Sequence, residues 1–223
     1  MSQPIARLED GDALYASLLA FGNTLRPVDE PNGYFCQIVT ELIDACLTNY
    51  RHMRQAHVDN NYPLLAWACR NLLELTIFMK YVLISEANAK RFGADRLIDG
   101  IEIFTALKEL ELHYDPATAT VPLDDAIAQM RAQMAAENVT ESGHLAVGRL
   151  ADQVGMTQEF RTMNRVSSKL VHPTAWSVLA VNAEVNSFPG AKDILFLSGV
   201  GYMAGTLIAA REHNSQHGMR PVP

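Results

Sequence analysis

The stretch LLAWACRNLLELTIFMKYVLI, from Leu64 to Ile84, is the longest strongly apolar run in this chain of 223 residues. Four of its side chains are charged or polar and would need partners inside a bilayer: Arg70, Asn71, Glu74 and Lys80. The stretch is therefore predicted to be the central helix of a protein core and not a membrane span. The rest of the chain has to pack around it.

Arg70 and Glu74 are four residues apart in this run, so at about 100° per residue they lie within about 40° of each other on the helix. A guanidinium and a carboxylate thus share one face of a core helix. Two interpretations stay open. The two groups can satisfy each other as an ion pair, because isolated buried charges are costly. Alternatively, they form one wall of a polar binding site.

The composition indicates a soluble protein with an ample core. A length of 223 residues is enough for one large helical domain or two small ones, and 48% apolar residues are enough for a sizeable core. The cysteines Cys36, Cys46 and Cys69 have neither disulfide nor zinc-ligand spacing and are expected to be reduced core residues. No signal architecture opens the chain, so a cytoplasmic protein with no membrane contact is expected. The net charge of −7 argues against broad nucleic-acid binding but leaves room for a local basic cleft.

Helical periodicity recurs along the chain, and no strand pattern competes with it. A first long helix is expected from Tyr34 towards His57, and Asn60 or Asn61 should cap the next helix, which has Pro63 in its first turn. One kinked helix or two consecutive helices should follow up to residue 115, and then a short helix from residue 124. Residues 145–165 loosely resemble a helix-turn-helix, but a small helical hairpin is preferred.

The predicted fold is therefore all-α, a single helical bundle of about seven helices. A clasp or linker is expected over residues 1–33, the bundle domain over 34–214 and a loose tail over 215–223. The last helix carries the small residues Gly199, Gly201, Ala204 and Gly205. Such residues allow either deep packing against the central helix or a subunit interface, and a homodimer is expected.

The densest candidate chemistry lies in the stretch NRVSSKLVHPTAW. Arg165, Ser168, Lys169 and His172 fall on one side of a helix, and Pro173 should force the backbone of His172 out of the helical conformation. A histidine at such a junction can exchange protons, while arginine and lysine can stabilise a phosphate. The alternative without a functional role is a histidine that caps the helix end, with Arg165 and Lys169 in solvent.

Metal chemistry is not expected. Glu141 and His144 have a metal-ligand spacing, but Gly143 between them argues against a rigid helical presentation. No paired Glu-x-x-His motifs exist for a di-metal bundle site. No metal and no cofactor are therefore predicted.

The blocks ACRNLLELTIFMKYVL (68–83) and SKLVHPTAWSV (168–178) resemble a widespread family of uncharacterised bacterial all-helical proteins. That family, a domain of unknown function, combines an Arg-x-x-x-Glu helix with a later Ser-x-x-x-His-Pro block, and the resemblance covers roughly residues 40–185. The arginine followed by a histidine on a late helix is also similar to the HEPN superfamily. Active members of that superfamily are dimeric, metal-independent ribonucleases. The chain departs from the HEPN pattern at Val166, where a polar residue is usual.

The resemblance implies a HEPN-like core and an RNA-cleaving protein of the toxin or phage-defence type, with Arg165 and His172 as the catalytic pair. From their positions on the two helices, Lys169 is expected to be a further catalytic residue, and Arg70, Glu74 and Ser168 are expected to be binding residues. The alternative is a non-catalytic helical module that binds a protein partner or a small anion in the Arg70/Glu74/His172 pocket. Both hypotheses place the site where the central helix meets the His172 junction.

Overall fold

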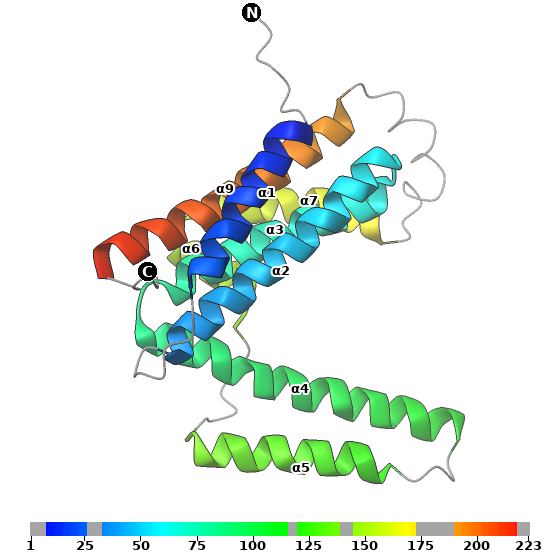
Figure 1. The fold of residues 1–223 in the computed structure, drawn as a ribbon. Coiled ribbons are helices and arrows are strands. Elements are labelled where there is room, and N and C mark those ends of the chain that lie inside the picture. Colours follow the sequence, from blue (N-terminus) through cyan, green and yellow to red (C-terminus); the bar gives the residue numbers. More distant parts are fainter. Residues whose placement is uncertain (1–7, 26–32, 116–119, 139–144, 173–189, 218–223) are drawn as a thin grey trace, which may run out of the picture. The chain divides into compact units, whose positions relative to one another are not determined.

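The computed structural model describes residues 8–25, 33–115, 120–138, 145–172 and 190–217. Over these residues the chain forms eight helices and no strands, which confirms the predicted all-α bundle of about seven helices (Figure 1). The helices are α1 (Leu8–Thr24), α2 (Gly33–Val58), α3 (Tyr62–Val82), α4 (Glu86–Tyr114), α5 (Val121–Ala136), α6 (Val147–Gln153), α7 (Thr157–Val171) and α9 (Ala191–His217).

The chain divides into two compact units. The first unit comprises Met1–Ser85 together with Val147–Pro223, and the second comprises Glu86–Ala146. Helices α1, α2, α3, α6, α7 and α9 thus belong to the first unit, and α4 and α5 to the second.

The first unit is built around α3, the helix predicted to be central. α3 packs against α2, α9, α7 and α6, while α1 lies against α2 and α9. The Asn61 side chain caps α3 by accepting a hydrogen bond from the backbone N–H of Leu64, and Pro63 lies in the first turn, as predicted. The short connection makes α2 and α3 antiparallel neighbours (Figure 1).

The core of the first unit contains a small set of polar groups that satisfy one another. The Thr76 hydroxyl lies 2.8 Å from the carbonyl oxygens of both Leu72 and Tyr202 and 3.0 Å from the hydroxyl of Thr206. The Cys46 thiol is 3.7 Å from the same Thr206 hydroxyl. These contacts join α2, α3 and α9 without leaving a buried hydroxyl unpaired, so they stabilise the packing.

The three cysteines are free thiols in the core, as predicted. Burial raises the pKa of Cys46 to about 12, against a small opposing effect of the Thr206 hydrogen bond. Burial likewise raises the pKa of Cys69 to about 12 and raises that of Cys36. The thiolate is the reactive form, so these cysteines act as small apolar residues.

The small residues of α9 permit a close approach to α2 and α3. A Cβ atom at Gly199 would collide with Met53 and touch Leu72, and one at Gly205 would lie 3.3 Å from Thr76 Cγ2. Deep packing against the central helix is thus the role of these two glycines. By length and composition alone, Ala191–Gln216 could also cross a membrane, but a core helix passes the same test.

The second unit is a helical hairpin of α4 and α5 (Figure 1). α4 runs as one helix through Gly93 and Gly100, where the sequence left open one kinked helix or two consecutive ones. Gly100 faces the Met130 thioether of α5, and Lys108 pairs with Asp124. The hairpin thus buries one side of α4.

The predicted small hairpin over residues 145–165 is formed by α6 and α7. Gly155 between them has a φ of +70°, a conformation that glycine adopts without strain. Gly148 of α6 lies against the ring of Phe160, so the two helices pack closely. This arrangement fixes α7, which carries the predicted His172 site.

Candidate functional site

The Arg70 guanidinium and the Glu74 carboxylate form an ion pair along α3, with Nε 2.8 Å from Oε1. Their side chains are 33% and 21% exposed, so the pair lies at the edge of the core. The next residue, Asn71, donates a hydrogen bond of 3.1 Å to Asn49 of α2. The polar groups of this face of α3 thus have partners within the first unit, as the self-satisfied interpretation expects.

The four predicted residues of α7 share one outward face. The buried residues of this helix are Met163, Ser167 and Leu170, and α7 packs against α3. Arg165 lies two residues from both Met163 and Ser167, about 160° away around the helix, and is exposed. Lys169 and His172 are also exposed. Ser168 is half-buried and donates its hydroxyl to the Arg165 carbonyl, 3.1 Å away.

His172 stands where α7 ends. It is the C-cap residue, with φ −87° and ψ 144°, an extended conformation. Because the ring of a following proline disfavours helical backbone, Pro173 explains this conformation. The prediction that His172 leaves the regular helix is confirmed. Pro173 and the remainder of its block lie outside the described residues.

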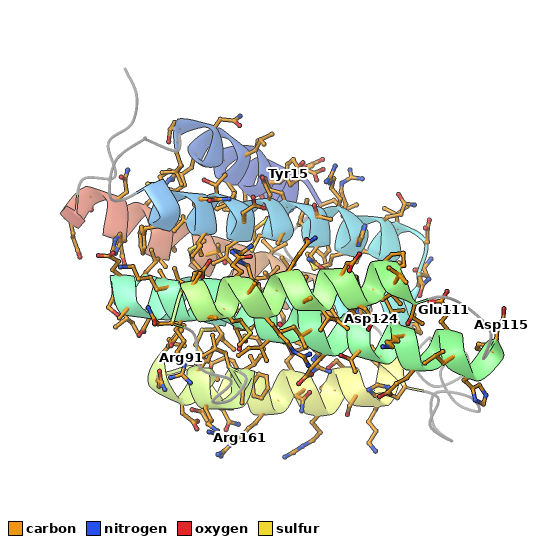
Figure 2. The ribbon with its side chains drawn as sticks, turned by 90° about the horizontal axis from the view of Figure 1, so that it is seen from below. Tyr15, Arg91, Glu111, Asp115, Asp124 and Arg161 are labelled. Atoms are coloured by element: carbon orange, nitrogen blue, oxygen red, sulfur yellow. The ribbon has the colours of Figure 1, made fainter. Side chains whose placement is uncertain are left out.

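Arg161 extends the same face and was missed as a site residue in the sequence analysis. It precedes Arg165 by four residues, is exposed, and points away from the α7 ribbon (Figure 2). Arg161, Arg165, Lys169 and His172 therefore form one row at intervals of four, four and three residues, here called the α7 basic row. The spacing is the signal that could have predicted Arg161, because a residue four positions before Arg165 shares its helix face.

The predicted pocket would require the Arg70–Glu74 pair of α3 to lie close to His172 in the α7 basic row. α3 packs against α7, yet Arg165 and His172 lie on the opposite side of α7 from its buried residues. The ion pair joins Arg70 to Glu74. Convergence of that pair with Lys169 and His172 in one pocket stays a prediction.

A second polar junction, unforeseen from the sequence, ties α2 to α9. His57 Nε2 lies 2.9 Å from Asp193 Oδ1, and the His57 ring is 4.8 Å from that of Phe196. Within the described part of the chain, His57 Nδ1 is buried without a hydrogen-bond partner. The two residues are 136 positions apart, so no local pattern could have paired them.

Asp12 of α1 accepts hydrogen bonds from two residues of α2, Arg54 and Tyr50. The Arg54 guanidinium makes a forked hydrogen bond to both carboxylate oxygens, and the Tyr50 hydroxyl donates at 2.8 Å. The hydrogen bond from Arg54 lowers the pKa of Asp12, while burial, followed by the bond to Asp12, raises that of Tyr50. These groups fasten α1 to α2.

Within the described ranges, no three histidine, cysteine, aspartate or glutamate side chains gather as ligands for a metal ion. Glu141 and His144 fall outside those ranges. Comparison of the chain with protein-family models, with curated proteins and with solved structures gives no match. The fold and the candidate site thus describe an all-helical bundle protein with a basic row on the outward face of α7.

Proposed function

We propose that this chain is a HEPN-like protein that cleaves RNA without a metal ion, using the outward face of α7. One observation carries the proposal. Arg161, Arg165, Lys169 and His172 are exposed in one row, and the histidine stands at the helix end. Cations in a row can neutralise successive phosphates of an RNA strand, and an exposed imidazole beside them can move a proton.

The chemistry required of this row is transfer of the phosphate from one oxygen to another. The 2′-hydroxyl attacks the adjacent phosphorus, its proton is removed, and the bond from phosphorus to the 5′-oxygen breaks as that oxygen gains a proton. His172 would act at one of these two proton transfers. Arg165 or Lys169 would stabilise the negative charge that builds up on the phosphorus oxygens. The products are a 2′,3′-cyclic phosphate and a 5′-hydroxyl.

The resemblance to the HEPN superfamily also implies a homodimer, in which a second copy would complete the cleft. α9 supports this proposal, since Ile194 and Ile208 are both 55% exposed and lie two heptads apart with the exposed Gly201 between them. A stable interface should bury at least about 1,200 Å² in total. Sedimentation of the full chain at micromolar concentration should show the dimer.

The test is cleavage of single-stranded and structured RNA by the full chain and its variants in EDTA. His172→Ala should lower the cleavage rate by roughly two to four orders of magnitude, the usual share of a general acid or base. Arg165→Ala should be similarly damaging. His172 is exposed, so its removal should leave the thermal midpoint close to that of wild type.

Matched controls come from elsewhere in the chain. His113→Ala removes an exposed histidine of α4, and Arg51→Ala an exposed arginine of α2, and neither should change the rate. Arg161→Ala should weaken RNA binding and reduce its salt dependence by about one phosphate contact. A wild-type dimer that binds the RNA through Arg161 and Arg165 without cleaving it would replace this proposal by the alternative, a non-catalytic module for anionic ligands.

A further inference from the structure

α4 carries a row of exposed apolar side chains in the second unit. Ile103, Leu107, Leu110 and Tyr114 follow one another at intervals of four, three and four residues, the spacing of a coiled-coil seam. They are 58%, 45%, 52% and 79% exposed. At about 100° per residue all four fall within about 60° of one another on the helix. They are here called the α4 apolar seam.

α5 does not cover this seam. Lys108, whose side chain pairs with Asp124 of α5, lies about 100° around α4 from Leu107. Leu97, buried earlier in α4, lies on the same side as Lys108. α5 therefore packs beside the seam and does not cover these four side chains. Contiguous exposed apolar side chains of this kind mark interaction sites.

The charge around the seam is acidic. Residues 86–146 contain eleven aspartates and glutamates against five lysines and arginines, so this unit carries a formal charge of −6 out of the chain's −7. Asp99 and Glu111 flank the seam on its two sides, and Glu111 and Asp115 lie towards the far end of α4 (Figure 2). The α4 apolar seam thus has exposed apolar side chains along its middle and carboxylates, Asp99 and Glu111, beside it.

We propose that the α4 apolar seam is the docking surface for a basic amphipathic helix of another protein. Such a helix would place its apolar residues on the seam, at heptad spacing, and its lysines or arginines beside Asp99 and Glu111. A second copy of this chain fits less well, because pairing two seams would bring two units of charge −6 face to face. The partner is thus defined by charge complementarity. This surface is independent of the proposed RNA cleavage.

The experiment measures binding of a synthetic helical peptide to the full chain by fluorescence anisotropy. The probe has leucine at the a and d positions of each heptad and lysine at e and g, and its partner probe has glutamate in place of lysine. The lysine peptide should bind, and should bind at least about tenfold more tightly than the glutamate peptide at low salt. Its affinity should fall as salt rises.

Three variants of the chain locate the binding. The double substitution Leu107→Ser with Leu110→Ser should weaken binding roughly 10- to 100-fold, because two half-exposed leucines no longer contribute apolar area. Leu19→Ser, which changes a 39% exposed leucine of α1, is the matched control and should leave binding unchanged. Glu111→Gln should reduce the preference for the lysine peptide.

Three results would overturn the proposal. The first is no binding of the lysine peptide at high micromolar concentration by a chain whose circular dichroism shows a folded protein. The second is equal binding of both peptides. The third is a wild-type dimer that the double seam variant, but not Leu19→Ser, converts to monomer, which would assign the seam to a second copy.

Discussion

Leu72 and Leu73 of α3 are completely buried, whereas Leu107 and Leu110 of α4 are about half exposed. Both helices are long and carry several leucines, yet α3 packs against four other helices of its unit, whereas α4 packs against α5. An apolar helical pattern therefore does not by itself specify a core. In the first unit the apolar residues hold the fold together, and in the second a row of them is available to a partner.

Truncation of one leucine in each unit tests this comparison most strongly. Leu72→Ala should destabilise the protein by about 2 to 5 kcal/mol, because it leaves a cavity among α2, α3 and α9. Leu110→Ala should cost less than about 0.5 kcal/mol. Chemical denaturation monitored by circular dichroism gives both values. Equal losses at the two positions would remove the distinction between a core helix and an exposed one.

Two glycines of α9, one in a tight contact and one in open space, test how closely the helices of the first unit pack. Gly199→Ala should cost about 1 to 2 kcal/mol, because the new methyl group collides with Met53 and Leu72 in a filled core. Nothing lies within 4 Å of a Cβ atom at Gly201. Gly201→Ala should therefore stabilise the helix by up to about 1 kcal/mol. Thermal melts of the two variants should shift in opposite directions.

The smallest expected effect comes from the surface ion pair between Asp12 and Arg54. The lowered pKa of Asp12 means that its contribution to stability is present above the ordinary value of 3.8 and is lost as the pH falls through the folded-state pKa. Asp12 is 42% exposed, so Asp12→Asn should cost at most about 1 kcal/mol near neutral pH.

Denaturation at several pH values checks this. The gap between wild type and Asp12→Asn should close as the pH drops below 3.8. A gap that widens towards low pH would mean that the carboxylate is not stabilised by Arg54. Arg54→Gln should reproduce most of the effect, because it removes the guanidinium that pairs with Asp12 and leaves the bond from Tyr50 in place.

Much of the fold could be predicted from local patterns. The boundaries of α2 and α3 follow from apolar periodicity, and the cap by Asn61 follows from its position before Pro63. The continuity of α4 could not be predicted, because Gly93 and Gly100 both weaken a helix in isolation. A close contact with Met130 accounts for Gly100.

The candidate site was predictable in part. The shared face of Arg165, Ser168, Lys169 and His172 follows from their spacing, and the conformation of His172 follows from Pro173. Which side of α7 faces outward depends on Met163 and Leu170 packing in the core, and that is a tertiary property. The pairing of His57 with Asp193 depends on the same kind of information.

The most direct test of the proposed function is the chemical nature of the ends of any RNA that the full wild-type chain cleaves in EDTA, read by mass spectrometry. The expected ends are a 2′,3′-cyclic phosphate and a 5′-hydroxyl, formed at a rate that falls sharply in His172→Ala and is unchanged in His113→Ala. An otherwise identical strand with a single 2′-deoxy sugar at the cleaved position should survive. Cleavage that persists in His172→Ala, or that leaves a 5′-phosphate, would contradict the proposed function.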